Sequence, residues 1–89
     1  MRSLLAADMD KCYYCGKPSK IVHAIYSTNL QQEKASIEDG MVIPVCWECN
    51  VRLHISEHKK NRLHIEGQIE WERHYPMLVF EKRYGRTFL

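Results

Sequence analysis

The distribution of apolar positions predicts two short strands separated by a polar segment. Residues 21–26, Ile-Val-His-Ala-Ile-Tyr, are rich in β-branched and aromatic side chains and favour a strand. Residues 41–45 predict the returning strand, in which Pro44 favours an edge position because proline has no backbone N–H to donate. Residues 27–40 are polar, so they predict a loop with a short helical turn around residues 31–37.

The second half of the chain predicts a long helix. Either Ser56 or Asn61 can cap its start, and Pro76 stops it after about Tyr75. We expect one face of this helix to pack on the core. At helical spacing that face carries His64, Gln68, Trp71 and Tyr75.

Length and composition predict one globular domain over residues 1–89. Hydrophobic residues make up 45% of the chain and charged residues 27%, a balance that excludes a disordered protein. We expect the core to span about residues 12–75, with a loosely ordered lead-in at residues 1–11 and a basic tail at residues 77–89. Domains this short bury little surface and often need a metal or disulfides.

Charge and apolar run length limit the partners and the compartment. The net charge is +2, with −1 over residues 1–50 and +3 over residues 51–89. A basic second half is typical of a protein with an anionic partner, and also of an ordinary solvated surface. No apolar run has the length of a signal-peptide core or a membrane span. We therefore expect a cytoplasmic protein, without membrane contact, whose cysteines stay reduced.

The four cysteines form two CxxC pairs, which predict a structural zinc site. Cys12 and Cys15 precede Gly16, and Cys46 and Cys49 follow after 30 residues. Two thiolates at this spacing can face one tetrahedral ion. Two disulfides, one redox pair or an iron site are the alternatives. We expect the second pair to open a helix. The order of knuckle, hairpin, cysteine pair and helix is that of an α+β, zinc-stabilised treble-clef (ββα-metal-like) domain with a C-terminal helix.

Two of the five histidines occupy positions that predict a second site. His23 lies on the first predicted strand, and His54 follows Cys49 by five residues. If zinc joins the strand to the following helix, these two side chains can face each other. His58 lies one helical turn beyond His54 if that stretch is helical. Facing histidines near a metal-bound hairpin suggest a functional metal site.

The order Cys12-x-x-Cys15, His23, Cys46-x-x-Cys49 and His54 resembles the HNH endonucleases, whose active-site fold is the ββα-metal finger. This match covers residues 12 to about 58. Weaker matches to small HNH-type proteins of bacteriophages and prophages extend it over most of the chain. They include residues 36–46 and the ending Phe-Glu-Lys-Arg-Tyr-Gly-Arg-Thr-Phe-Leu at residues 80–89.

The resemblance implies metal-dependent hydrolysis of nucleic-acid phosphodiesters, with DNA as the expected substrate. It implies that His23 is the general base, that Asn29 orients this base, and that His54 is a ligand of a catalytic ion, Mg²⁺ or Mn²⁺. His58 is a reserve ligand. A base suited to neutral pH and a Lewis acid at the developing charge are the two parts that this chemistry needs.

The sequence also departs from the family. Val22 and Ala24 flank His23 where many relatives have a further histidine or acidic residue, and Asn50 follows the second cysteine pair where many have histidine. A non-catalytic zinc module that binds nucleic acid or protein is therefore the second hypothesis, and a structural zinc protein of phage assembly or takeover is the third. We expect nucleic-acid contacts from Lys59, Lys60, Arg62, Lys82, Arg83 and Arg86.

Overall fold

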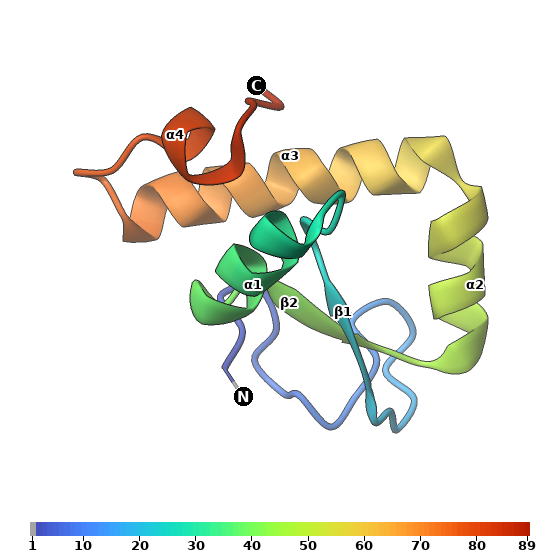
Figure 1. Ribbon diagram of the computed structural model, residues 1–89. Coiled ribbons are helices and arrows are strands. Elements are labelled where there is room, and N and C mark those ends of the chain that lie inside the picture. Colours follow the sequence, from blue (N-terminus) through green and yellow to red (C-terminus); the bar gives the residue numbers. More distant parts are fainter. Residues whose placement is uncertain (1) are drawn as a thin grey trace.

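A two-stranded hairpin and four helices make up the regular structure of residues 2–89, which the computed structural model describes (Figure 1). The arrangement confirms the expected α+β class. In Figure 1 the longest helix crosses one side of the hairpin, and a shorter helix connects the two. In chain order the elements are β1 (Ile21–Ala24), α1 (Leu30–Glu38), β2 (Val42–Val45), α2 (Trp47–Ile55), α3 (Glu57–His74) and α4 (Phe80–Tyr84).

The hairpin pairs β1 with β2 in antiparallel register, with Ile21 opposite Val45. The first strand is shorter than predicted, because Ile25 and Tyr26 leave the ladder. Both side chains are nevertheless almost fully buried. The apolar pattern of residues 21–26 thus extends past the paired strand into a buried segment, where Ile25 still donates its backbone N–H to the carbonyl of Met41 at 3.0 Å.

The segment between the strands contains a full helix, where the sequence predicted only a short turn. Asn29 starts α1: its side-chain oxygen accepts a hydrogen bond from the backbone N–H of Gln32 at 2.9 Å. The buried face of α1 carries Gln32, Ala35 and Ser36. These residues are small or polar, so the face lacks the apolar spacing by which an amphipathic helix is recognised.

Ser56 separates α2 from α3. Its hydroxyl accepts a hydrogen bond from the backbone N–H of Lys59 at 3.2 Å, so it caps α3 as one of the two predicted candidates. The end of α3 before Tyr75 and Pro76 is confirmed. Within residues 2–89, none of the helices combines the length and apolar character that crossing a membrane requires.

Gly67 lets the segment after β1 approach α3 closely. A Cβ atom at this position would lie 2.6 Å from the hydroxyl oxygen of Tyr26. That hydroxyl donates a hydrogen bond to the carbonyl oxygen of His64 at 2.7 Å. The glycine therefore sits inside a helix, where it costs stability, because the ring that packs beside it leaves no room for a side chain.

Both chain ends belong to the core, which corrects the prediction of a loose lead-in and a tail. Leu4 and Leu5 pack against the core, and the backbone N–H of Leu4 donates to the carbonyl of Gly40 at 2.9 Å. Phe80 and Tyr84 of α4 are each only 2% exposed. The core therefore extends beyond residues 12–75, because a short domain uses the apolar side chains of both ends to bury enough surface.

Asp39, directly after α1, joins three parts of the fold. Its carboxylate accepts hydrogen bonds from the indole N–H of Trp71 at 2.8 Å and the hydroxyl of Tyr84 at 2.9 Å. The Arg83 guanidinium forms two further bonds to it, at 2.9 and 3.1 Å. Burial acts to raise the pKa of Asp39, but the bonds from these three side chains outweigh it and hold the pKa below its ordinary value.

We expect Asp39→Asn to lower the free energy of unfolding by about 2 kcal/mol, because the amide replaces a charge-assisted acceptor at the centre of this network. Urea unfolding at pH 7 measures the change. Glu38→Gln is the matched control: its carboxylate lies 3.8 Å from Arg83 but is 54% exposed, so we expect a loss below about 0.5 kcal/mol. Equal stability of the two variants would contradict the central role of Asp39.

The same network predicts a pH dependence. The folded-state pKa of Asp39 lies below its unfolded value, so its contribution is present above about pH 4 and is lost as the pH falls further. The stability difference between the wild type and Asp39→Asn should therefore shrink below about pH 4. Urea titrations of both proteins at several pH values would detect this convergence, and a difference independent of pH would contradict it.

Candidate metal centre and histidine hollow

The first cysteine pair lies in a tight loop at the open end of the hairpin. The backbone N–H of Cys12 donates to the carbonyl of Lys17 at 2.7 Å, and the N–H of Gly16 donates to the carbonyl of Cys12 at 3.0 Å. Gly16 has φ of +78°, a conformation that residues with a side chain rarely adopt. The expected knuckle is therefore present, and it directs the side chains of Cys12 and Cys15 to the same side.

The second cysteine pair begins α2. Cys46 is the N-cap residue, and its sulfur accepts a hydrogen bond from the backbone N–H of Cys49 at 3.5 Å. This location confirms the prediction that the second pair opens a helix.

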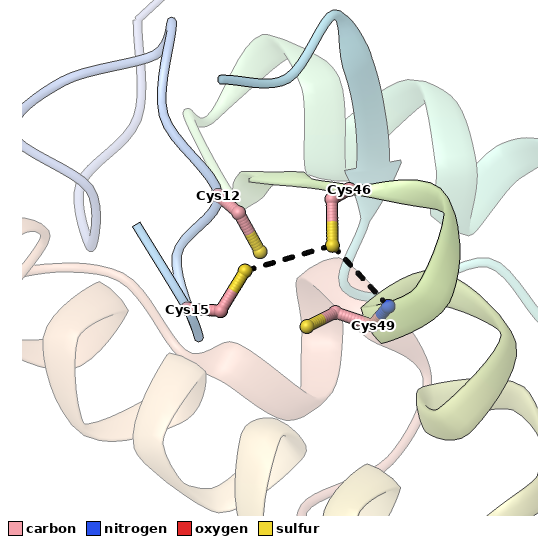
Figure 2. A group of neighbouring side chains, drawn as sticks. All are labelled: Cys12, Cys15, Cys46 and Cys49. Atoms are coloured by element: carbon pink, nitrogen blue, oxygen red, sulfur yellow. Dashed lines mark hydrogen bonds between the residues drawn. The ribbon is translucent and has the colours of Figure 1, made fainter. Parts of the chain in front are cut away.

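All four sulfurs point into one space between the knuckle and α2 (Figure 2). They lie within 4.8 Å of one another, and the sulfurs of Cys15 and Cys46 are 3.6 Å apart. Zinc–sulfur bonds of about 2.3 Å in a tetrahedron place the sulfurs about 3.8 Å apart. The cluster therefore has the size of a four-thiolate metal shell, and all four cysteines are free.

The acidity of the thiols fits such a shell. Burial acts to raise the pKa of Cys12, but backbone hydrogen bonds from Cys46, Cys15 and Tyr14 lower it to about 6. Burial and the neighbouring sulfurs raise the pKa of Cys49 to about 12. One thiolate thus opposes the ionisation of the next, and a bound cation would remove this repulsion and release the remaining protons.

A second group of polar side chains lines a hollow between β1, α2 and the start of α3. The rings of His23 and His54 face each other, with centroids 5.5 Å apart and planes at 85°. The hollow has a volume of about 210 Å³. We call it the histidine hollow, and its lining residues are His23, Ile25, Ser27, Thr28, Leu53, His54, Lys60 and His64.

The histidine hollow keeps His23 uncharged. Burial lowers the pKa of His23 to about 4, and the charges of His54 and His64 contribute to the same shift. Burial is also the main cause of a lowered pKa at His64. At neutral pH both imidazoles are therefore free bases, each with a ring nitrogen that can accept a proton or bind a metal.

Two predicted site residues lie elsewhere. His58 belongs to α3, beyond the break at Ser56, and lines a different hollow with Tyr14 and Arg62. His58 does not follow His54 by one helical turn, as the sequence predicted, because the two residues belong to different helices. Asn29 is not in the lining of the histidine hollow, and its side-chain oxygen caps α1.

The six predicted nucleic-acid contacts do not form one surface. Of the three on α3, Lys60 lines the histidine hollow, whereas Arg62 pairs with Glu66 at 3.2 Å. Lys59 lies over the ring of Tyr14, 6.0 Å from its centroid.

The three C-terminal cations have different surroundings. Lys82 lies beside the apolar turn between α3 and α4. Arg83 binds the buried Asp39 and is part of the fold. Arg86 lies over the ring of Phe88, with its guanidinium carbon 4.3 Å from the centroid. The cations of the predicted basic tail therefore have different roles.

Sequence reasoning assigned His64 to packing and missed its place in the histidine hollow, together with Ser27 and Thr28. The spacing of Lys60 and His64, four residues apart on one helix, was the available signal because it places both on the same face. In comparisons with known proteins, no family model, curated protein or solved structure matches this chain.

We expect the purified protein to carry about one zinc ion per chain, since four thiolates complete one tetrahedral shell. Cys49→Ser should lose this zinc and most of the folded population, because metal binding and folding are coupled in such sites. Elemental analysis and thermal melting under reducing conditions measure both. Stoichiometric iron in place of zinc would support the iron alternative.

Two controls make this test specific. Glu48→Ser, at an exposed position in the same helical turn, should retain the metal and the wild-type melting temperature. A chelator should reduce the wild-type melting temperature to that of Cys49→Ser and leave the variant unchanged. A Cys49→Ser protein that lost its metal yet melted like the wild type would contradict a structural role.

Proposed function

We propose that this chain is a treble-clef zinc domain of the ββα-metal type. The zinc would be held by Cys12 and Cys15 of the knuckle and by Cys46 and Cys49 at the start of α2. Three observations support this: the positive φ of Gly16, the antiparallel hairpin between the cysteine pairs, and the N-cap position of Cys46. The ion would fix the direction in which α2 leaves the hairpin.

On this scaffold we propose metal-dependent hydrolysis of nucleic-acid phosphodiesters, with DNA as the substrate. The observation that carries the proposal is the facing pair of His23 on β1 and His54 on α2, 5.5 Å apart in the histidine hollow. A base on the strand opposite a ligand on the helix is the arrangement expected from the resemblance to HNH endonucleases. Lys60 adds a positive charge at the same hollow.

The residues supply two parts of this reaction. A ring nitrogen of neutral His23 would accept a proton from water as the water oxygen attacks phosphorus and the bond to the leaving oxygen breaks. His54 would hold a divalent ion, Mg²⁺ or Mn²⁺, which supplies Lewis-acid stabilisation of the developing negative charge. Lys60 would attract the nucleic-acid backbone through its charge.

A binding module without catalysis is the second candidate, and one observation favours it. Within residues 2–89, the four cysteines are the only group of three or more histidine, cysteine or acidic side chains gathered closely enough to hold a metal. A catalytic ion at His54 would therefore depend on water and phosphate oxygens for most of its ligands. Weak ion binding of this kind would leave a nucleic-acid-binding domain with little hydrolysis.

We expect His23→Ala to reduce DNA cleavage by about 10²–10⁴-fold, the range typical for loss of a general base, without changing zinc content or DNA affinity. His54→Ala should also reduce cleavage, but raising the concentration of Mg²⁺ or Mn²⁺ should partly restore its rate, because this variant weakens ion binding. Gel-based cleavage assays and ion titrations measure the contrast.

His74→Ala is the matched control, because His74 is exposed in the last turn of α3, away from the histidine hollow. It should cleave like the wild type. If the wild type binds DNA but cleaves none with either ion, the binding-module candidate replaces the nuclease. Identical responses of His23→Ala and His54→Ala to added ion would contradict their separate roles.

A further inference from the structure

The last residues of the chain are fixed against α3 by a buried side chain. Gln68 is only 2% exposed. Its amide N–H donates to the hydroxyl of Thr87 at 2.9 Å, and its amide oxygen accepts from the backbone N–H of Phe88 at 2.7 Å. This pair of bonds holds the segment after α4 at a defined position along α3, next to the turn that carries His64.

Phe88 connects this segment to the histidine hollow. Its ring centroid is 4.6 Å from that of His64 and 5.4 Å from that of Tyr26. His64 lines the hollow, so Phe88 packs behind one of its walls. The segment after α4 and the histidine hollow are therefore joined through the imidazole of His64.

Arg86 is positioned by the same ring. Its guanidinium carbon lies 4.3 Å from the centroid of Phe88, a cation–π contact that orients the side chain. Arg62, Arg73 and Arg83 each pair with a carboxylate within 4.0 Å. Among the described residues, no carboxylate lies within that distance of Arg86, so its charge is available to a ligand.

Lys60 is the second cation near His64. It lies one helical turn before His64 and lines the hollow, with Glu57 as an exposed partner at 3.3 Å. After burial, the main cause, the charges of Arg86 and Lys60 both lower the pKa of His64. The two cations therefore act on one small region, although 26 positions separate them in the sequence.

We propose that Arg86 and Lys60 form a phosphate subsite at the rim of the histidine hollow, and that Gln68 and Phe88 are positioning residues that hold Arg86 there. The ligand is a backbone phosphate of a nucleic-acid strand, adjacent to the phosphate that would lie between His23 and His54. This inference rests on the proposed function for its substrate class. A guanidinium matches the planar, paired oxygens of a phosphate, and a lysine adds a point charge.

The subsite gives the C-terminal segment a function in binding rather than in chemistry. Its residues contact neither the water nor the leaving oxygen of the proposed reaction. Arg86→Gln should therefore weaken binding of a short mixed-sequence DNA duplex about eightfold at about 0.1 M salt, and reduce the salt slope by about one. The rate of cleavage at saturating DNA should stay unchanged.

The experiment measures fluorescence anisotropy of the labelled duplex without divalent ion, over a series of salt concentrations, with zinc-loaded full-length protein. Arg73→Gln is the control, because it removes the same charge from the far end of α3 and should leave the affinity near the wild-type value. Lys60→Gln should match Arg86→Gln. The loss of DNA affinity in the double variant should be smaller than the product of the losses in the two single variants, because both residues bind one phosphate.

The outcomes separate this inference from the proposed nuclease activity. If the wild type binds DNA through Arg86 but never cleaves it, the subsite is supported and only the proposed hydrolysis is wrong. If the wild type cleaves DNA and the variants Arg86→Gln and Arg73→Gln bind DNA with equal affinity, only the subsite proposal is wrong. If the affinity losses of Lys60→Gln and Arg86→Gln multiply in the double variant, the two residues do not bind one phosphate. Absence of any DNA binding at low salt overturns both proposals.

Discussion

Four sulfur atoms from two distant segments meet at the N-terminus of α2, and the placement of the surrounding elements depends on this contact. The knuckle at residues 12–15, the end of β2 and the first turn of α2 all converge there (Figure 2). Thiols packed this closely repel one another when ionised, and a cation held between them would remove this repulsion. From this junction α2 runs so that the ring of His54 faces that of His23 on β1.

The rest of the core is built around aromatic rings rather than around the cysteine cluster. Trp71, Phe80 and Tyr84 pack together on one side of α3, and Tyr26 and Phe88 continue this cluster towards the histidine hollow. The buried carboxylate of Asp39 joins α1 to α3 and α4. A domain of this size reaches enough burial only by including both chain ends. The same packing brings the C-terminal segment beside His64.

The sequence predicted those elements that depend on residues close together in the chain. The doubled CxxC spacing, the β-branched run at residues 21–26 and the capping Ser56 each act over a few residues, so the metal ligands, the hairpin and α3 could be found in the sequence. The helix α1 was underestimated because its buried face is polar. Its side chains are satisfied by distant groups, as when Gln32 donates to the carbonyl of Tyr84 at 2.7 Å.

By itself, the sequence determined which cysteines form the cluster, and it singled out the strand histidine and the histidine after the second pair as candidates for a site. Tertiary structure decided which of the remaining polar residues join them. It placed Lys60 and His64 in one hollow, packed Phe88 against His64, assigned Arg83 to Asp39, and moved His58 to a different surface. These outcomes depend on the break at Ser56 and on the path of the chain after Pro76. Contacts between residues far apart in sequence follow from how helices pack, and short-range spacing carries no information about that packing.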